Sequence, residues 1–278
     1  MGVAGMDSKP SGYLGLRVAG LTTAFAAACF LTAGSAAAAD PNLAVNGSFA
    51  TTSATSAEFG STNNGYTPTV QLTGWTTAGY NFVFLPNTAD TTGAVGQYNT
   101  TATVASPGLR LWGPNDGGGA NGLVTASPTG GNFIAADGAY EISAITQTIT
   151  GLNVGAKVYV SFAWAGAQQS GFTGPTTDKW TVDLGSSPSQ STPVVSLPSQ
   201  GATAWMNETF SFIATNSSEV LSFLTTGTPA GQPPFALLSN VVVTAPEPES
   251  VALMLSGVVG LMIAARRRGS RTAARISG

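Results

Sequence analysis

The sequence predicts an all-β fold for the central part of the chain, an antiparallel β-sandwich. Short segments there alternate between apolar and polar residues, which is the pattern of strands that bury one face. Turn signals rich in Gly, Asn and Pro separate these segments. No segment shows the sustained periodicity of an amphipathic helix. Short strands separated by frequent turns are typical of two antiparallel sheets packed on one core.

The clearest predicted strand is Lys157–Trp164. Its apolar residues occupy alternate positions and so share one face: Val158, Val160, Phe162 and Trp164. The last predicted strand, Phe235–Val243, is the most apolar, which predicts a central position in its sheet. The same alternation predicts further strands at Trp180–Leu184, Phe210–Phe212 and Leu221–Phe223.

Glycines and small polar residues predict the connections between strands. Gly151–Gly155 contains two glycines between the predicted strands Ile145–Thr150 and Lys157–Trp164, which indicates a hairpin. Residues 42–49 are predicted to form a first strand that ends in a turn. Long loops are expected where Ser, Thr, Asn and Gly dominate, at 51–69, 86–108 and 113–122.

The charge and the missing residue types exclude several functions. Region 40–245 carries three basic and ten acidic residues, a net charge of −7, which disfavours nucleic acid and anionic lipid as partners. The chain has no histidine, which excludes Ser-His-Asp catalysis and histidine-ligated zinc. The only cysteine, Cys29, precedes this region, so the region has no disulfide and no thiolate metal site.

Residues 1–39 have the organisation of a secretory signal peptide. Positive charge precedes the apolar run Val18–Leu31, and Ala37-Ala38-Ala39 forms an A-x-A cleavage motif. Cleavage is expected between Ala39 and Asp40. Lipidation of Cys29 is the alternative, but the residues before Cys29 lack the large aliphatic side chain expected of such a signal.

Residues 246–278 form a separate C-terminal segment. The uncharged run Val251–Ala265 contains fifteen residues, enough for about 22 Å of helix, whereas a comfortable transmembrane helix needs about 20 residues. This run therefore predicts one short transmembrane helix. The arginines that end it would stay on the cytoplasmic side. A plain membrane anchor is one interpretation of this segment.

The C-terminal segment also resembles the PEP-CTERM sorting signal of Gram-negative bacteria. Three parts match in order: Pro246-Glu247-Pro248, the short apolar helix, and the cluster Arg266, Arg267 and Arg268. The resemblance implies an exosortase as partner, transient residence in the inner membrane, and cleavage near Pro-Glu-Pro. It also implies export to the cell surface or extracellular matrix. The basic stretch 269–278 runs past the usual end of such signals.

Several central segments together resemble the galactose-binding-like jelly rolls of bacterial surface proteins. This resemblance implies a jelly-roll sandwich, a fold used both by carbohydrate-binding modules and by structural domains. Relatives often hold a calcium ion with acids at two positions where this chain has Ala50 and Ser239. This calcium site is therefore expected to be absent. Asp116 and Asp137 could support a different ion but are more simply interpreted as loop or turn residues, so no metal and no cofactor are expected. The matching segments are 42–49, Gly74-Trp75, 131–138, 147–159 and 236–241.

Sugar sites combine aromatic rings with amide and hydroxyl groups. The aromatic residues expected in loops include Tyr80, and segment Gln168–Gly174 offers amides beside a ring. An alternative interpretation is that the tryptophans only plug the ends of the core. The predicted binding residues are Trp112, Gln168, Gln169, Phe172 and Trp205.

The sequence thus predicts a signal peptide (1–39), a β-sandwich domain (40–245) and a sorting segment (246–278). The expected function is that of a non-catalytic, exported surface or matrix protein associated with exopolysaccharide or biofilm. The alternative is a carbohydrate-binding module with a specific glycan ligand. A glycan-active enzyme would need paired carboxylates, for which Asp137/Glu141 and Asp178/Asp183 are the nearest pairs in sequence.

Overall fold

The computed structural model describes residues 41–51, 53–60, 67–68 and 70–246, together with the single positions 257, 260 and 262. All of these belong to one compact unit, Asp40–Gly278. The predicted signal peptide lies outside the described residues. So does the predicted membrane helix with its arginines, apart from the three single positions. No helix among the described residues is long and apolar enough to cross a membrane.

The described chain between residues 41 and 246 is all-β, as predicted. Its regular structure between residues 70 and 246 is entirely strand, and every strand pair is antiparallel. The strands are β1 (Ala57–Gly60), β2 (Tyr80–Phe84), β3 (Phe133–Asp137), β4 (Ile145–Thr150), β5 (Lys157–Gln168), β6 (Thr176–Leu184), β7 (Gln190–Ser191), β8 (Val195–Leu197), β9 (Met206–Ile213), β10 (Ser218–Thr228) and β11 (Pro234–Thr244).

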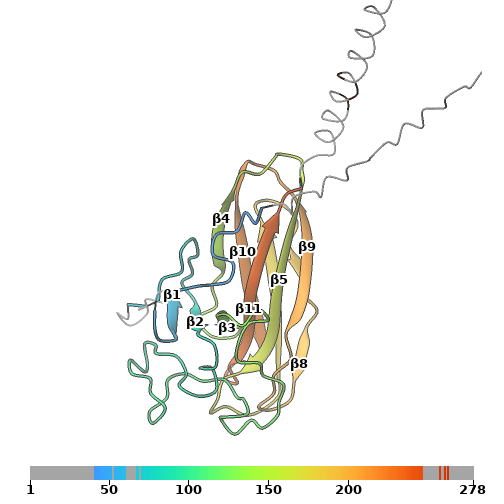
Figure 1. Cartoon of the computed structure of the whole chain (residues 1–278). Helices are drawn as coiled ribbons and strands as arrows, with labels where there is room; N and C mark the ends of the chain where they lie inside the picture. Colours follow the sequence, from blue (N-terminus) through green and yellow to red (C-terminus); the bar gives the residue numbers. More distant parts are fainter. Residues whose placement is uncertain are drawn as a thin grey trace, which may run out of the picture. The chain divides into compact units, whose positions relative to one another are not determined.

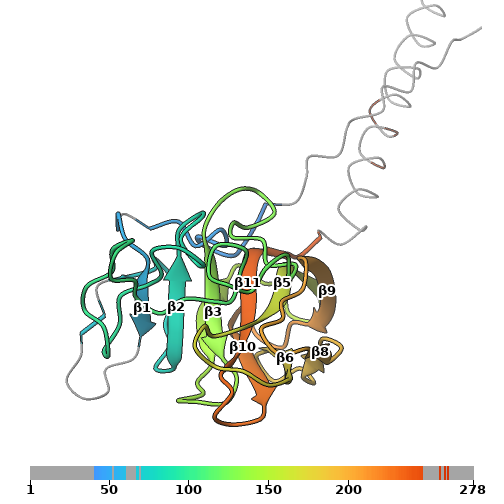
Figure 2. The same cartoon turned by 90° about the horizontal axis from the view of Figure 1, so that it is seen from below.

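These strands form two sheets that pack face to face as a β-sandwich (Figures 1 and 2). The six-stranded sheet has the order β1-β2-β3-β11-β5-β9. The other sheet has the order β4-β10-β6-β7, with β8 also paired to β6. The last strand, β11, lies between β3 and β5, so its predicted central position is confirmed.

The predicted hairpin at Gly151–Gly155 is wrong. This segment links two sheets, because β4 pairs with β10 whereas β5 pairs with β9 and β11. The glycines do turn the chain, with φ of 80° at Gly151 and 83° at Gly155. Leu152 between them is buried in the core. Burial of this apolar side chain draws the segment across the end of the sandwich, which prevents a hairpin.

The predicted first strand at 42–49 is also wrong, because this segment forms consecutive turns. The side chain of Gln147, rather than a neighbouring strand, bonds to the backbone of Val45. Gln147 Oε1 accepts from Val45 N at 2.8 Å, and Gln147 Nε2 donates to Val45 O at 2.8 Å. Gly47 approaches β11 so closely that a Cβ would lie 1.9 Å from Val241 O. The predicted 51–69 loop contains a strand, β1, that was not expected.

The core between the sheets is centred on aromatic rings from both layers. Phe223 of β10 lies 5.2 Å from Phe162 of β5, 6.1 Å from Trp180 of β6 and 6.2 Å from Trp75, measured between ring centroids. The apolar face predicted for Lys157–Trp164 is buried in this core, which confirms that prediction. Trp180 Nε1 also donates to Leu237 O in the opposite sheet at 3.1 Å.

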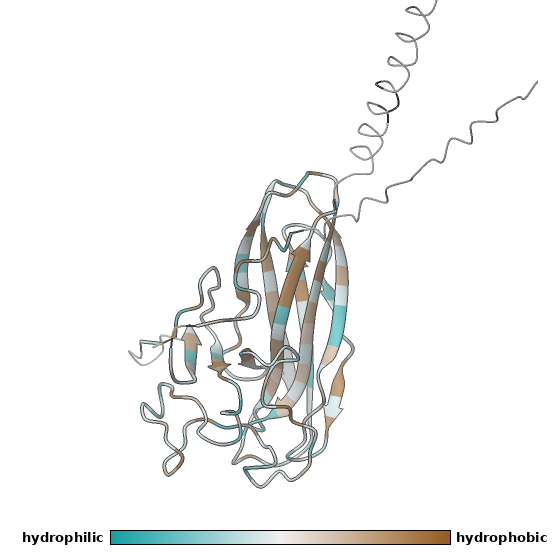
Figure 3. Ribbon diagram, in the orientation of Figure 1, coloured by the Kyte–Doolittle hydropathy of each residue, from teal (hydrophilic) through white to brown (hydrophobic). Residues whose placement is uncertain are grey.

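A second core lies on the outer face of the six-stranded sheet. Strands β2 and β3 are buried on both faces, and apolar colour continues along β11 and β5 (Figure 3). The connection between β2 and β3 supplies the covering side chains, which include Ala89, Ala94, Leu111 and Leu123. The outer-face apolar residues of the sheet itself are Tyr80, Phe82, Phe84, Phe133, Ala135, Ala165, Ala167, Phe235 and Leu237.

Replacing the central ring should destabilise the domain strongly. Phe223→Ala leaves a cavity among three other rings, and we expect it to lower the free energy of unfolding by about 3–5 kcal/mol. Val220→Ala on the same strand is the control, because Val220 is 49% exposed and its loss should cost less than about 1 kcal/mol. Urea unfolding of both variants measures the difference, and equal losses would contradict this description of the core.

Candidate functional site

The register of the six-stranded sheet places a mixed row of side chains on its outer face. Asn81 pairs with Ala136, so the neighbouring residues Tyr80 and Asp137 lie side by side on β2 and β3. Asp137 in turn pairs with Phe235 of β11. The row therefore places a carboxyl group between two aromatic rings. The alternation of each strand directs all three side chains towards the β2–β3 connection.

Three tyrosines and a phenylalanine form an aromatic cluster at this place. The Tyr80 ring lies 4.7 Å from Phe82, 5.3 Å from Tyr140 and 6.3 Å from Tyr98, centroid to centroid. The hydroxyls of Tyr98 and Tyr140 are 3.0 Å apart and share a hydrogen bond. Tyr98 is 63% exposed and Tyr140 is 43% exposed. Two of these rings therefore present large surfaces to solvent.

A pocket of about 190 Å³, the tyrosine pocket, opens beside this cluster. The turn at 96–99 forms part of its wall and is closed by two backbone hydrogen bonds between Gly96 and Asn99. The Asn99 amide donates to Pro107 O at 2.8 Å and so holds the turn in place. The lining residues are Tyr80, Phe82, Ala94, Gly96, Tyr98, Asn99, Gly108, Leu109 and Gln169.

Two carboxyl groups lie behind the pocket wall. A Cβ built on Gly96 would lie 2.7 Å from Glu58 Oε2, and this oxygen accepts from Gln97 N at 2.7 Å. Burial raises the pKa of Asp137 to about 6, although hydrogen bonds from the backbone N–H groups of Ala139 and Tyr140 lower it in part. Burial, then the charges of Glu58 and Asp137, raise the pKa of the Tyr80 hydroxyl well above its usual value.

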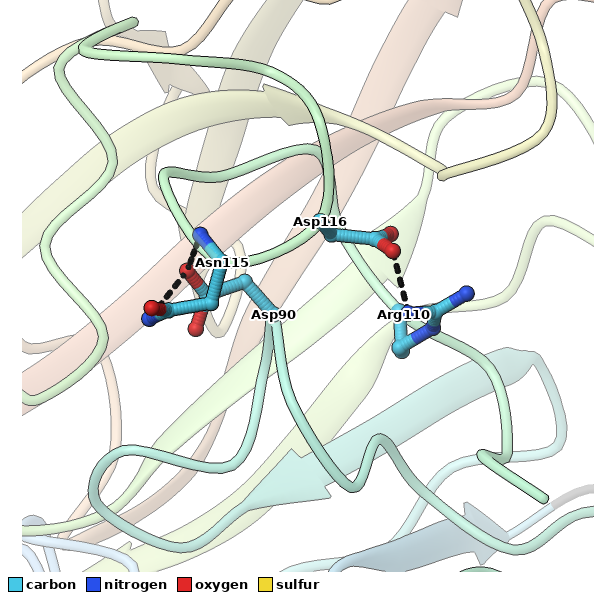
Figure 4. A network of polar contacts seen from close by, with 4 residues as sticks. All are labelled: Asp90, Arg110, Asn115 and Asp116. Atoms are coloured by element: carbon cyan, nitrogen blue, oxygen red, sulfur yellow. Dashed lines mark hydrogen bonds and ion pairs between the residues drawn. The ribbon is translucent and has the colours of Figure 1, made fainter. Parts of the chain in front are cut away.

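Polar contacts stiffen the connection that covers this face (Figure 4). Asp90 Oδ2 accepts from Asn115 N at 2.9 Å and from Asn115 Nδ2 at 3.0 Å. Arg110 forms an ion pair with Asp116 across the same loop. Trp112 N donates to Gln168 O at 2.9 Å, which ties the loop to β5. The predicted loops at 86–108 and 113–122 are therefore joined by the hydrogen bonds from Asn115 to Asp90.

Three of the predicted binding residues, Trp112, Gln168 and Phe172, lie together at the end of β5. Trp112 Nε1 donates to Phe172 O at 2.7 Å. Gln168 is fully buried, and its amide donates to Gly174 O and Gln232 O and accepts from Gln200 N. These bonds occupy the Gln168 amide within the fold. Phe172 is 38% exposed and contributes its ring to the surface.

The other two predicted residues lie elsewhere. Gln169 lines the tyrosine pocket. Trp205 packs edge-on against Phe133 at 5.6 Å and donates from Nε1 to Ala126 O, so it belongs to the second core. Sequence reasoning missed Tyr98 and Tyr140 and placed Tyr80 in a loop rather than in β2. The cluster of Gly96, Tyr98 and Asn99 within a polar loop was the signal that could have drawn attention to this turn.

Residues 50 and 239, where relatives were expected to carry calcium-binding acids, form hydrogen bonds between uncharged groups in this chain. Ser239 Oγ donates to Asn132 O at 2.9 Å, and Asn132 Nδ2 donates to Phe49 O at 2.9 Å. The nearby Ala50 N donates to Asn46 Oδ1 at 2.8 Å. Among the described residues, no three Cys, His, Asp or Glu side chains form a group that could hold a metal ion.

The carboxylates of Asp178 and Asp183 do not point towards each other. The two residues lie on opposite faces of β6, with Asp178 buried in the sandwich and Asp183 half-buried on the outer side. Neither side-chain oxygen of Asp178 has a hydrogen-bond partner among the described residues. Burial, and to a smaller extent Asp137, raise the pKa of Asp178 well above its usual value.

The comparisons with known proteins identify no family. No family model matches the chain, and no curated protein matches it. Among solved structures, the xylan-binding domain CBM22-1 of Paenibacillus barcinonensis Xyn10C is 13% identical, covers 76% of this chain and 97% of its own, and has a TM-score of 0.32. The TmCBM61–galactotriose complex is 11% identical, with 50% and 82% covered and a TM-score of 0.29.

A cleaved adhesin domain, K3 of the Lys-gingipain of Porphyromonas gingivalis, is also similar. It is 12% identical, with 45% of this chain and 86% of its own covered and a TM-score of 0.28. These identities and scores carry no argument about what this chain binds.

The buried carboxyl groups of Asp137 and Asp178 should make the stability of the domain depend on pH. Both are harder to ionise in the folded chain than in the unfolded chain, so the folded chain binds more protons between pH 3.8 and about 6. The free energy of unfolding should therefore fall as pH rises through this window. Asp137 accounts for about 3 kcal/mol of the fall, and Asp178 acts in the same direction.

Urea unfolding at about pH 4 and about pH 7 measures this fall. Asp137→Asn should reduce it, because asparagine keeps an acceptor oxygen for the N–H groups of Ala139 and Tyr140 but cannot ionise. Glu208→Gln, on the edge strand β9, is the control and should leave the fall unchanged. A wild-type chain that gains stability over this pH range would contradict the assignment.

Proposed function

We propose that the domain is a non-catalytic glycan-binding module and that the tyrosine pocket receives a sugar ring. The observation that carries this proposal is the pocket of about 190 Å³ that Tyr80 and Tyr98 help to line. Sugar recognition needs an aromatic surface for the apolar face of the ring and a few polar groups for its hydroxyls. The exposed ring of Tyr98 supplies the first requirement, and the tyrosine hydroxyls and Gln169 supply the second.

A non-catalytic role is supported by the absence of acids from the pocket lining. Glycoside hydrolysis needs two carboxyl groups that flank the scissile bond and reach it directly. Glu58 and Asp137 are buried behind the wall instead. Asp137 Oδ1 is also held by two backbone N–H groups. The pocket is therefore suited to binding rather than to proton transfer.

The proposed setting is the cell surface or extracellular matrix, with an exopolysaccharide as ligand and no role for nucleic acid. In this proposal residues 1–39 direct export, and an exosortase processes segment 246–278 at the inner membrane. One structural observation supports processing of segment 246–278. β11 ends at Thr244, and Pro246 is exposed just after it, so cleavage near Pro246-Glu247-Pro248 would leave β1–β11 of the described region intact.

Loss of one exposed ring should weaken glycan binding. Tyr98→Ala should reduce the affinity of the full chain for exopolysaccharide from the producing cells by about tenfold or more, as measured by calorimetry. Tyr159→Ala is the matched control, because Tyr159 lies on β5 opposite Ser211 and lines a different pocket. Equal affinity in the Tyr98 variant would exclude this pocket, and no binding by the wild-type chain would exclude the proposed function.

Replacing Pro246-Glu247-Pro248 with three alanines should block sorting. We expect the altered chain to accumulate in the membrane fraction at the size of the chain without its signal peptide. The wild-type chain should be shortened further and released. Immunoblots of cell fractions measure this difference. Release of the altered chain at the wild-type size would contradict exosortase processing.

A further inference from the structure

The tyrosine pocket is too small for a run of linked sugars. Its volume of about 190 Å³ lies below the range of about 300–1,000 Å³ that is usual for pockets of drug-sized ligands. Its floor is closed, because the lining residues Phe82 and Ala94 are fully buried in the second core. The pocket therefore has room for one sugar ring and does not extend inwards to take a second.

Two walls of the pocket are backbone segments that pack without a gap. Gly96 lies against the floor, since a Cβ built on it would lie 3.0 Å from Phe82 Cε1. Gly108 approaches the neighbouring segment so closely that its Cβ would lie 2.1 Å from Ala94 O. Two hydrogen bonds of 2.8 and 2.9 Å join the backbones of Ala94 and Leu109 at the same place. A chain of sugars cannot pass through either wall.

Hydrogen bonds also join the other segments around the pocket. The hydroxyls of Tyr98 and Tyr140 share a hydrogen bond of 3.0 Å. Next to the lining residue Gln169, Ser170 N donates to Arg110 O at 2.8 Å, which joins the end of β5 to the covering loop. The described residues around the pocket are thus tied to one another, and the pocket opens to solvent beside Tyr98, which is 63% exposed.

This shape distinguishes between the units of a glycan chain. An internal sugar unit is linked to a neighbour on each of two sides, so a pocket that encloses it must be open at two places. A terminal unit is linked on one side only and can enter a pocket through a single opening. It also carries a free hydroxyl where the chain would otherwise continue, and polar groups in the pocket can bond to that hydroxyl.

We propose that the tyrosine pocket binds the terminal sugar unit of a glycan chain or branch rather than an internal unit. The proposal rests on the proposed glycan-binding function and adds which part of the glycan is recognised. The ring of Tyr98 would cover the apolar face of the terminal unit, and Gln169 and the tyrosine hydroxyls would bond to its free hydroxyls. The rest of the glycan would leave the pocket beside Tyr98.

Calorimetry with the full chain can test this selection. The probe is exopolysaccharide from the producing cells, used intact and, at equal mass, after partial acid hydrolysis. Hydrolysis multiplies the chain ends without creating new internal linkages. We expect the amount of protein bound per unit mass of glycan to rise in proportion to the number of chain ends. The dissociation constant per bound end should stay the same to within about threefold.

Borohydride reduction of the fragments shows which end is bound, because it opens the ring at the reducing end and leaves the non-reducing end intact. Capacity that survives reduction supports binding of the non-reducing end. Capacity gained by hydrolysis and lost on reduction supports binding of the reducing end.

Matched variants assign the effect to this pocket. Tyr98→Ala should lower the affinity for the fragments by about tenfold or more. Tyr159→Ala should keep both the affinity and the gain in capacity of the wild-type chain, because Tyr159 lines a different pocket.

Each other outcome overturns a defined part of the argument. Capacity that stays constant or falls on hydrolysis, with binding lost in Tyr98→Ala, would refute recognition of chain ends and leave the glycan-binding function standing. A gain in capacity that Tyr98→Ala leaves unchanged would refute the pocket as its source. No binding of intact or hydrolysed exopolysaccharide would refute the proposed function itself.

Discussion

The need to bury both faces of the six-stranded sheet determines the rest of this structure. Phe82, Phe84, Phe133 and Phe235 all face away from the sandwich core, and a sheet that left these rings in water would lose a large part of its hydrophobic stabilisation. The chain meets this requirement with the long connection between β2 and β3. The tyrosine pocket lies at the margin of that cover, where the apolar face ends and polar residues begin.

The sequence predicted those strands that bury one face. Lys157–Trp164 and Trp180–Leu184 alternate cleanly, because each has one face in the core and one in a less buried environment. Strands β2 and β3 do not alternate, since all of their residues are buried. A short apolar run of this kind is ambiguous in sequence, and the second core was missed for that reason.

The candidate site was harder to predict than the fold, because its parts come from separate segments. Tyr80 begins β2, Tyr98 belongs to the covering loop, and Tyr140 follows β3. Only the pairing of β2 with β3 brings them together. The predicted residues Trp112 and Phe172 do meet, through a hydrogen bond from a ring nitrogen to a carbonyl oxygen. The loop positions of Trp112 and Phe172 were predicted from the sequence, but their contact and the pairing between distant strands were not.

The central position of β11 links folding to the order of synthesis. This strand pairs with both β3 and β5, and residues 43 and 47 also bond to it. A nascent chain that lacks its last described residues therefore has no partner for the inner edges of two strands and cannot close either core. Such a chain stays open until its C-terminal region has been made. In the proposed export this delay would be an advantage, because a chain that has not closed its cores can still be threaded through a narrow channel.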